Sequence, residues 1–287
     1  MFSRHKKIHL NGKNIVAHVI FLATKNVVRF IILLKIIQIS IGKISAVKIF
    51  GIDMKVIAMS DLHGNLPVVI EKFDLMLIPG DICPVWNHRR EFQFEWLKTE
   101  FSDWIKSLPF NDENSKVILC GGNHDMVLEN ISKKKINEIL DPLEGRLVYL
   151  DNEEYFFKNN GKEYHIFATP YCKQFGNWAF MRSPEKLEQY YSFIPEGLDF
   201  LMSHDSPDFP PIGVITEGTY KGIRAGNPQL AKAILEKKPK WCIFGHIHSG
   251  THEVQVLIEE KINLTNVALL NEEYDMMYAP LTMDYQK

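Results

Sequence analysis

Seven side chains suited to metal binding lie at intervals along this chain, close to the ends of short apolar runs. They are Asp61, His63, Asp81, Asn123, His204, His246 and His248. Carboxylates, an amide oxygen and imidazoles form a hard-to-borderline ligand set without thiolates, which favours Mn²⁺, Fe or Zn²⁺. Seven ligands are too many for one tetrahedral ion and suit two ions about 3.5–4 Å apart that share a carboxylate. The residue types therefore predict a centre of two divalent metal ions, with Mn²⁺ as the first candidate.

The elements that carry these ligands must bring them together. Six short apolar runs have the composition of buried strands, and five of them lead into the ligands. The runs cover residues 55–59, 74–79, 116–121, 164–170, 198–204 and 241–246. In open α/β sheets, binding sites form outside the carboxyl ends of the strands. Ligands that are far apart in the sequence are therefore expected to converge at that edge.

Helical segments separate several of these strands. Residues 91–108 place apolar side chains three and four positions apart, which gives one apolar stripe. Shorter helices are predicted from Ser183 to about Ser192 and from Asn227 to Lys237, because each begins with a capping residue followed by proline. The alternation of strands and helices predicts an α/β layered domain. Two strand-like runs at residues 254–260 and 263–270 are expected to close it with further sheet.

Glycine precedes a ligand at three of the strand exits, at Gly80, Gly122 and Gly245. A residue without Cβ allows unusual φ angles and a close approach of the backbone to a metal or a phosphate. The alternative is that each glycine is an ordinary turn residue.

Charge divides the chain into two parts of different composition. The chain has 287 residues, with 33 Lys and Arg against 35 Asp and Glu, and a formal net charge of −2. Nine of the basic residues and none of the acidic ones precede residue 53, so the remainder holds 24 basic and 35 acidic residues, a net charge of −11. A composition that is 46% hydrophobic and 24% charged excludes a disordered or collagen-like chain. Residues 1–53 are therefore interpreted separately from residues 54–287.

The basic, aliphatic leader at residues 1–53 has three interpretations. It is an over-extended start of the reading frame, a weak membrane anchor or targeting segment, or an integral part of the fold. The first is favoured because Met54 begins a natural globular domain. The longest charge-free stretch of the leader, residues 14–24, has 11 residues, whereas a transmembrane helix needs about 20. Basic residues among Ile, Leu and Phe suit anionic lipid, so membrane contact is expected only if the leader is genuine.

The four cysteines indicate a reducing compartment. Cys83, Cys120, Cys172 and Cys242 are widely spaced and form no CxxC pair, which excludes a zinc-ribbon or thioredoxin-type motif. Two of them lie in apolar runs, where a reduced, buried thiol is expected. We therefore expect a cytoplasmic protein.

Five ordered motifs together resemble the calcineurin-like metallophosphoesterase superfamily. They are Asp61-x-His63, Gly80-Asp81, Gly122-Asn123-His124-Asp125, His204 and Gly245-His246-x-His248, all within residues 54–287 and outside the leader. Segments 80–83, 92–108, 169–170, 176–180 and 266–270 are similar to the metallophosphoesterase-domain-containing branch, which is related to class III cyclic nucleotide phosphodiesterases. The resemblance implies a four-layer α/β/β/α sandwich of two mixed sheets flanked by helices, with the metal site at one sheet edge.

The resemblance also implies how the ligands divide between the two ions. One ion would be bound by Asp61, His63, Asp81 and His248. The other would be bound by Asp81, Asn123, His204 and His246, with Asp81 bridging the pair. The ions would lower the pKa of a bridging water, and the resulting hydroxide would attack phosphorus in line. His124 would contact the phosphate or protonate the leaving alkoxide, and Asp125 would orient it.

These implications describe a dinuclear-metal phosphoesterase that hydrolyses a phosphodiester in a small, nucleotide-like substrate. The first alternative is a phosphomonoesterase or a pyrophosphohydrolase of nucleotide conjugates, and the second is a catalytically weak metal-binding scaffold. A nucleic-acid enzyme is a third alternative. A body with a net charge of −11 repels a polyanion, so strong nucleic-acid binding is not expected. The sequence leaves the oligomeric state open.

Four further residues are candidates for contact with the substrate: Asn65, His88, Trp178 and Arg224. His88 follows the second motif and could touch a phosphate, although a solvated helix start is also expected there. Trp178, together with Phe175 and Phe180, could stack on a base or belong to the core. Arg224 and Asn227 lie between the fourth and fifth motifs, in a region that often caps such sites.

Overall fold

The computed structural model of the chain describes residues 4–10, 13–19, 53–140, 143, 145–257 and 259–287. Contacts between residues divide the chain into two units, Met1–Phe50 and Gly51–Lys287. In the first unit, strand β1 (Arg4–Leu10) pairs antiparallel with β2 (Lys13–Val19). Most of the expected leader, residues 20–52, lies outside the described residues, so its interpretations stay predictions. No helix in the described ranges is long and apolar enough to cross a membrane.

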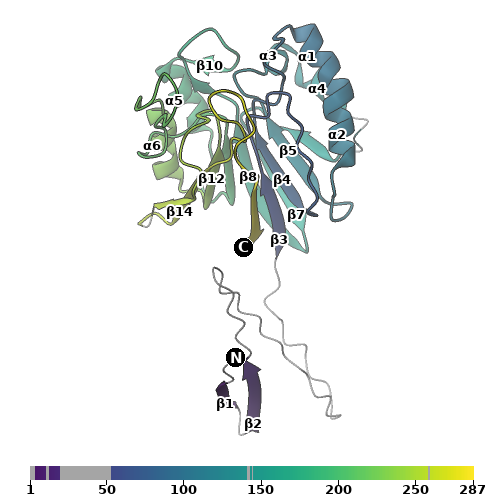
Figure 1. Cartoon of the computed structure of the whole chain (residues 1–287), viewed down its shortest axis with the longest axis vertical. Coiled ribbons are helices and arrows are strands. Elements are labelled where there is room, and N and C mark those ends of the chain that lie inside the picture. The colour runs from purple at the N-terminus through teal and green to yellow at the C-terminus, as the bar shows by residue number, and fades with distance from the viewer. Residues whose placement is uncertain (1–3, 11–12, 20–52, 141–142, 144, 258) are drawn as a thin grey trace. The chain divides into compact units, whose positions relative to one another are not determined.

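A five-stranded mixed sheet forms one half of the second unit (Figure 1). In spatial order its strands are β15 (Leu281–Tyr285), β3 (Met54–Ala58), β4 (Leu75–Pro79), β5 (Lys116–Cys120) and β6 (Leu147–Tyr149). Strands β3 to β6 run parallel, and β15 pairs antiparallel with β3. The strands β3, β4 and β5 are almost continuously apolar because elements cover both faces of the sheet.

A six-stranded mixed sheet forms the other half. In spatial order its strands are β13 (Gln255–Leu257), β14 (Ile262–Asn266), β12 (Trp241–Phe244), β11 (Phe200–Ser203), β8 (Lys162–Thr169) and β7 (Glu153–Asn159). The inner four strands run parallel, and the outer two are antiparallel to their neighbours. A small parallel pair, β9 (Cys172–Lys173) with β10 (Met181–Arg182), follows β8. All six predicted strand runs and both runs of the tail therefore contain strands.

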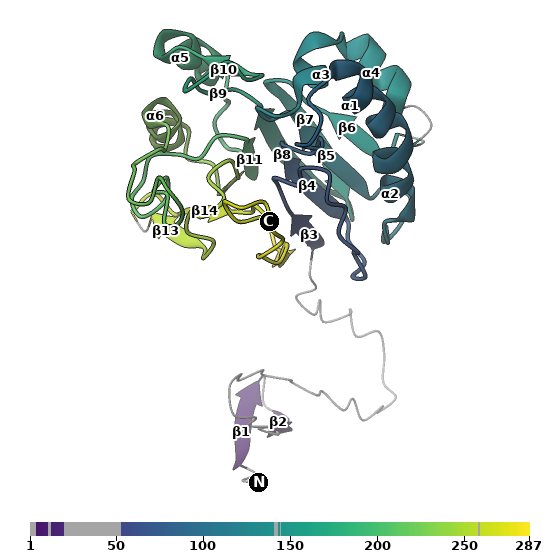
Figure 2. The same cartoon turned by 45° about the horizontal axis from the view of Figure 1, so that its top comes forward.

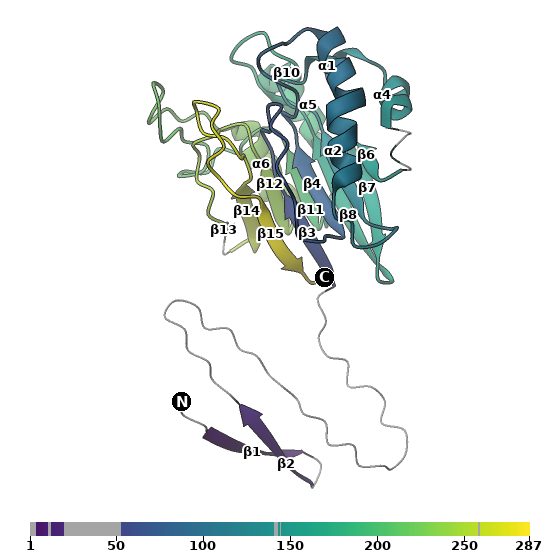
Figure 3. The same ribbon diagram turned by 45° about the vertical axis from the view of Figure 1, so that its right-hand side comes forward.

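Helices cover the outer face of each sheet (Figures 2 and 3). Beside the first sheet lie α1 (Arg90–Trp96), α2 (Ser102–Ser107), α3 (Met126–Asn130) and α4 (Lys133–Leu140), and beside the second lie α5 (Pro184–Ser192) and α6 (Pro228–Lys237). Alternate strand residues such as Val56 and Ile166 form one core between the sheets. Their neighbours, such as Ile57 and Phe167, belong to the core that includes the helices. The expected four-layer α/β/β/α sandwich is confirmed.

The three predicted helices are present with nearly the predicted bounds. The first is continuous over residues 90–107, because α1 passes through a π-helical turn (Leu97–Phe101) into α2. Most of its apolar stripe is buried, as Leu97, Phe101 and Ile105 show. Helix α6 begins at the predicted cap, where the Asn227 side chain accepts hydrogen bonds from the N–H groups of the first turn (2.9 and 3.1 Å).

Asp199, at the start of β11, ties the second sheet to the C-terminus. Its fully buried carboxylate accepts hydrogen bonds from the His165 N–H and the Tyr285 hydroxyl (both 2.9 Å), and it pairs with Lys240 (2.8 Å) and Lys287 (2.9 Å). Burial alone would raise the pKa of Asp199, but these contacts together lower it. We expect Asp199→Asn to reduce the free energy of unfolding by about 2 kcal/mol at pH 7, because it weakens hydrogen bonds to charged groups.

The sign of this pKa shift sets the pH dependence of the effect. A carboxyl whose pKa is lower in the folded chain stabilises the fold above its unfolded pKa, and the stabilisation is lost as the pH falls through the folded pKa. Denaturant unfolding of the wild-type chain and of Asp199→Asn should therefore differ at pH 7 and converge well below pH 4. An equal difference at both pH values would show that the charge of Asp199 has no such role.

Candidate metal centre

Loops at the carboxyl ends of β3, β4, β5, β11 and β12 carry all seven predicted ligands. Four of these ligands, Asp61, His63, Asp81 and His246, have φ angles of 54°, 46°, 52° and 71°, in the left-handed region that non-glycine residues seldom occupy. The Asp61 N–H donates to the carbonyl of Gly80 (3.1 Å), and the His63 N–H donates to the carbonyl of Asp81 (3.0 Å). Strained backbone of this kind persists only where its surroundings fix it, and it clusters at functional sites.

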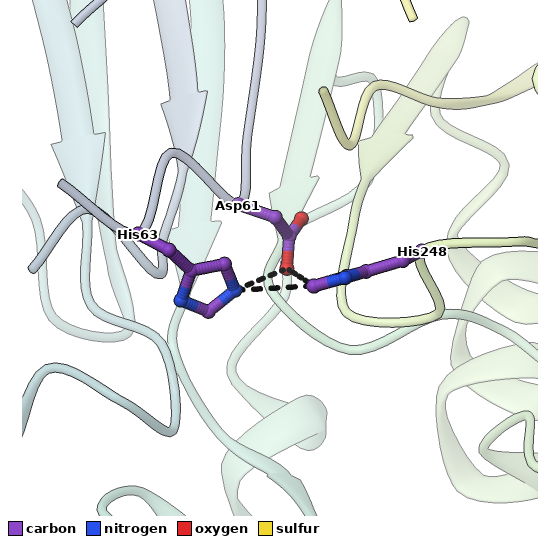
Figure 4. Close-up of side chains that lie close together, drawn as sticks. All are labelled: Asp61, His63 and His248. Atoms are coloured by element: carbon purple, nitrogen blue, oxygen red, sulfur yellow. Dashed lines mark hydrogen bonds and ion pairs between the residues drawn. The ribbon is translucent and has the colours of Figure 1, made fainter. Parts of the chain in front are cut away.

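Asp61, His63 and His248 form the first group of candidate ligands (Figure 4). Nε2 of His63 lies 3.1 Å from Nε2 of His248. Oδ1 of Asp61 lies 3.4 Å from Nε2 of His248 and 4.0 Å from Nε2 of His63. The three buried side chains point toward one another from loops that follow different sheets, so the fold of the whole domain assembles this group.

Asp61, Asp81 and His204 form the second group, with one ligand atom of each within 4.8 Å of the others. Nε2 of His204 lies 3.5 Å from Oδ2 of Asp81 and 2.9 Å from Oδ1 of Asn123. The same Asp81 oxygen lies 3.7 Å from Nε2 of His63, in the first group. Asp61 is thus shared by the two groups, and Asp81 faces a histidine of each.

Hydrogen bonds behind two of the imidazoles direct their Nε2 atoms into the centre. Nδ1 of His248 donates to the carbonyl of Asn271 (2.9 Å), and Nδ1 of His204 donates to the carbonyl of Pro79 (3.0 Å). Because a carbonyl only accepts, Nδ1 carries the proton in the neutral ring and Nε2 presents a lone pair. The Nε2 lone pair of His204 therefore faces the oxygen of Asn123. The lone pairs of these two atoms repel each other. A cation between them would be coordinated by both atoms, which would remove the repulsion.

Negative and neutral groups are crowded in this buried centre. Burial raises the pKa of Asp81 well above its ordinary value, and two neighbouring carboxylates raise it further. Burial and neighbouring imidazoles lower the pKa of His63 and His246 well below the ordinary value. His248 differs, because burial lowers its pKa but the neighbouring Asp61 carboxylate raises it by more. Divalent cations would offset the carboxylate charge and bind the neutral imidazoles, so these residues fit a metal.

Two glycines make room for the carboxylate ligands. A Cβ atom at Gly245 would lie 2.0 Å from Oδ2 of Asp61 and from Oγ of Ser60, and one at Gly122 would lie 2.3 Å from Oδ1 of Asp81. Real Cβ atoms essentially never show contacts under 3.0 Å. The sequence left two interpretations of these glycines open, a close approach to a metal or a phosphate and an ordinary turn. In the structure the close approach is to the ligands themselves.

His246 contacts the centre through its backbone as well as its ring. Its N–H donates to both carboxylate oxygens of Asp61 (3.1 Å each), and its ring centroid lies 5.0 Å from that of His204. The resemblance implied that Asp81 is the carboxylate shared by both ions. Asp81 has a position compatible with this role, because its Oδ2 faces His63 at 3.7 Å and His204 at 3.5 Å, and Asp61 belongs to both groups of candidate ligands.

His124 lies beside the centre, but its ring does not have the partner expected from the sequence. The ring centroid of His124 is 4.9 Å from that of His63. The carboxylate of Asp125 accepts the backbone N–H groups of Cys83 and Gly122 (2.8 Å each), and no hydrogen bond joins it to the His124 ring within the described residues. Asp125 therefore fixes the loop that carries His124 instead of orienting the imidazole.

Aromatic side chains border the centre. The Trp178 ring lies 5.1 Å from His88 and 4.6 Å from His124, measured between ring centroids. The Phe175 ring is 5.4 Å from that of His246, and its side chain is 61% exposed. Phe180, the third aromatic residue of this segment, is buried in the core. Trp178 and Phe175 therefore form part of the rim, and His88 belongs to it as well.

The other predicted substrate contacts have different partners. The Asn65 side chain donates to the carbonyl of Leu62 (3.1 Å) in its own turn. Arg224 is exposed and pairs with Asp208. Asn227 is buried and caps α6. Each of these contacts orders a loop, and none of them places the side chain at the metal centre.

Sequence reasoning missed two residues that contact the centre, Asn271 and Tyr274. The carbonyl of Asn271 accepts the proton of Nδ1 in His248. The Tyr274 ring lies 5.0 Å from that of His63 and 5.3 Å from that of His248, and the residue has a φ of 66°. Both follow the strand-like run at 263–270. The rule that located the candidate ligands, polar residues after a buried strand, could therefore have found these two residues as well.

Comparisons with known sequences place this site in a family. A family model described as calcineurin-like phosphoesterase matches residues 54–250. Human metallophosphoesterase domain-containing protein 1 is 23% identical over 249 residues, which cover 79% of this chain and 70% of that protein. A UPF0046 protein of Caenorhabditis elegans is 26% identical over 238 residues, which cover 75% of this chain and 57% of that protein.

A solved structure shares the fold, with a TM-score of 0.54 and 14% sequence identity over 74% of this chain and 89% of that one. At this identity the likeness concerns the fold alone. The family match is more specific, because residues 54–250 include every candidate ligand from Asp61 to His248. The chain belongs to the calcineurin-like phosphoesterase family and is a metal-dependent phosphoric ester hydrolase.

Proposed function

We propose that the chain hydrolyses a phosphodiester in a small, nucleotide-like molecule and uses two divalent metal ions, with Mn²⁺ as the first candidate. The observation that carries the proposal is the sharing of Asp61 by two adjacent groups of buried ligands. Ligands of the Asp, Asn and His types suit Mn²⁺, Fe and Zn²⁺. When bound, two such ions lower the pKa of water and neutralise the phosphoryl oxygens.

The chain's own side chains then have distinct roles. Asp61 and Asp81, with the imidazoles around them, hold the ions in a buried and rigid frame. His124 lies next to this frame and donates a proton to the leaving oxygen as the P–O bond breaks. The rim residues Trp178 and Phe175 offer ring faces on which a base can stack.

Charge and cysteine chemistry support a small substrate in a reducing compartment. Residues 53–287 carry a net charge of −11, which disfavours a long polyanion such as DNA. The cysteines at positions 83, 120, 172 and 242 are all buried and free. Free thiols persist in the reducing conditions of the cytoplasm.

A panel of esters tests the preference for diesters. With Mn²⁺ bound to the full chain, kcat/KM on bis-p-nitrophenyl phosphate is expected to exceed that on p-nitrophenyl phosphate by about tenfold or more, a ratio that pocket contacts of 1–3 kcal/mol supply. The panel then extends to 2′,3′- and 3′,5′-cyclic nucleotides. Faster hydrolysis of the monoester or of a nucleotide-conjugate pyrophosphate would overturn the diester assignment. A fully metallated chain that cleaves none of these esters would indicate a binding scaffold instead.

A further inference from the structure

We propose that His88 is a positioning residue that holds the His124 imidazole in the orientation needed to protonate the leaving group. His88 is 36 residues before His124, in the segment between β4 and α1, and lies outside the five ligand motifs. The inference rests on the proposed function, because it assigns His88 a part in phosphoester hydrolysis.

The two imidazoles contact each other directly. Nε2 of His88 lies 3.1 Å from Nδ1 of His124, which is hydrogen-bonding distance, and the ring centroids are 5.3 Å apart with an interplanar angle of 35°. A partner at Nδ1 fixes the rotation of the His124 ring about its Cβ–Cγ bond. Because Nε2 lies on the far side of the same rigid ring, its direction is fixed too.

Helix α1, which begins two residues after His88, also holds the backbone of His124. Gln93, on α1, is fully buried, and its Nε2 donates to the carbonyl of His124 (2.8 Å) while its Oε1 accepts the Val127 N–H (3.0 Å). The His124 N–H in turn donates to Oδ1 of Asp81 (2.7 Å). Both backbone groups of His124 are thus fixed, and rotation of its side chain is the freedom that remains for His88 to restrict.

Trp178 encloses the two imidazoles on a further side, with contacts to both rings. Its loop is tied to the centre because the Ala179 N–H donates to the carbonyl of Asn123 (3.1 Å). A phenylalanine at position 88 would keep a ring against Trp178 while removing both nitrogens. The substitution His88→Phe therefore removes the hydrogen bond to His124 without leaving a cavity in place of the His88 ring.

The reaction gives the positioning role a specific signature. As the P–O bond breaks, the His124 ring in its imidazolium form gives an N–H proton to the leaving oxygen, so a new O–H bond forms and the ring becomes neutral until it takes up a proton from solvent. Phenoxide needs this proton far more than p-nitrophenoxide, which is stable as an anion. Misorientation of His124 should therefore slow esters with poor leaving groups selectively, whereas a general structural defect would slow all esters alike.

The experiment compares three variants of the full chain, assayed with Mn²⁺ on diphenyl phosphate and on bis-p-nitrophenyl phosphate. His88→Phe removes the hydrogen bond, and His88→Gln keeps a side-chain amide that can bond to Nδ1 of His124. His165→Phe is the matched control, since His165 lies in β8, stacks on Phe156 (4.4 Å between centroids) and pairs with Glu154 (2.9 Å).

For His88→Phe, kcat on diphenyl phosphate is expected to fall by about 10²-fold, at the lower end of general-acid effects, while kcat on bis-p-nitrophenyl phosphate falls by less than about threefold. KM and bound metal should not change. His88→Gln should recover most of the loss, and His165→Phe should match the wild-type chain. Equal losses of kcat on both esters, or no loss, would overturn the role of His88. Failure of the proposed function looks different, because the wild-type chain would then cleave neither ester.

Discussion

Replacement of Asp81 by asparagine is expected to lower kcat/KM on bis-p-nitrophenyl phosphate by about 10³-fold or more, since bound metals supply several kcal/mol of transition-state stabilisation. Oδ2 of Asp81 lies 3.5 Å from Nε2 of His204 and 3.7 Å from Nε2 of His63, one histidine from each group of ligands. Asparagine keeps the size of the side chain but removes its negative charge and one acceptor oxygen. The metal content of the purified variant should fall together with its turnover.

The stability of the metal-free Asp81→Asn chain should not fall with its activity. Burial and the charges of Asp125 and Asp61 raise the pKa of Asp81, so the buried carboxylate is unfavourable when no cation offsets it. We expect the metal-free variant to melt at or above the temperature of the metal-free wild type. Asp103→Asn on the exposed face of α2 is the matched control, and it should alter neither metal content nor rate. Wild-type turnover in Asp81→Asn would exclude Asp81 as a ligand.

Gly245→Ala is expected to have the second-largest effect, a loss of about 10²-fold in kcat/KM, comparable to the loss of the groups that orient metal ligands. The new methyl group would lie 2.0 Å from Oδ2 of Asp61 and from Oγ of Ser60, so one of the two loops must move. Those loops carry Asp61 on one side and His246 and His248 on the other. Turnover assays with a titration of Mn²⁺ should show both a lower rate and a weaker apparent affinity for the metal.

Gly197→Ala is the control for Gly245→Ala. It removes a glycine at a position where the new methyl group meets no neighbouring atom. Gly197 has a φ of 74°, and nothing lies within 4 Å of the position its Cβ would take. The substitution should cost about 1–2 kcal/mol of stability from the left-handed backbone and leave turnover unchanged. If Gly245→Ala lowered stability by a similar amount and kept its turnover, the close packing against Asp61 would have no catalytic importance.

The sequence was sufficient to locate the candidate ligands because each follows a strand buried on both faces. Such strands are short and almost entirely apolar, as in residues 75–79 and 116–120, so they are visible without knowledge of the fold. Two edge strands, Glu153–Asn159 and Leu281–Tyr285, were not predicted. Their side chains alternate between less and more exposed positions, and their charged residues obscure the pattern. The short helices α3 and α4 were likewise not predicted.

The contacts between the loops of the site join residues that are far apart in the sequence. No local sequence pattern shows which of these residues meet in the folded chain. The family resemblance implied Asp125 as the partner of His124, whereas the structure provides His88 from the segment before α1. The carbonyl of Asn271 behind His248 comes from the segment between β14 and β15. Each contact joins the loops that follow two neighbouring strands of one sheet, β4 and β5 in the first case and β12 and β14 in the second.

Hydrolysis by this chain is expected to require bound divalent metal, and this requirement can be measured directly. The full chain is treated with a chelator, freed of it by dialysis, and assayed on bis-p-nitrophenyl phosphate while Mn²⁺ is added back. We expect turnover to fall to the buffer rate in the metal-free chain and to return with Mn²⁺, with bound metal approaching two ions per chain, as two adjacent groups of ligands require. Full turnover by the metal-free chain would contradict the assignment of these residues to a catalytic metal centre.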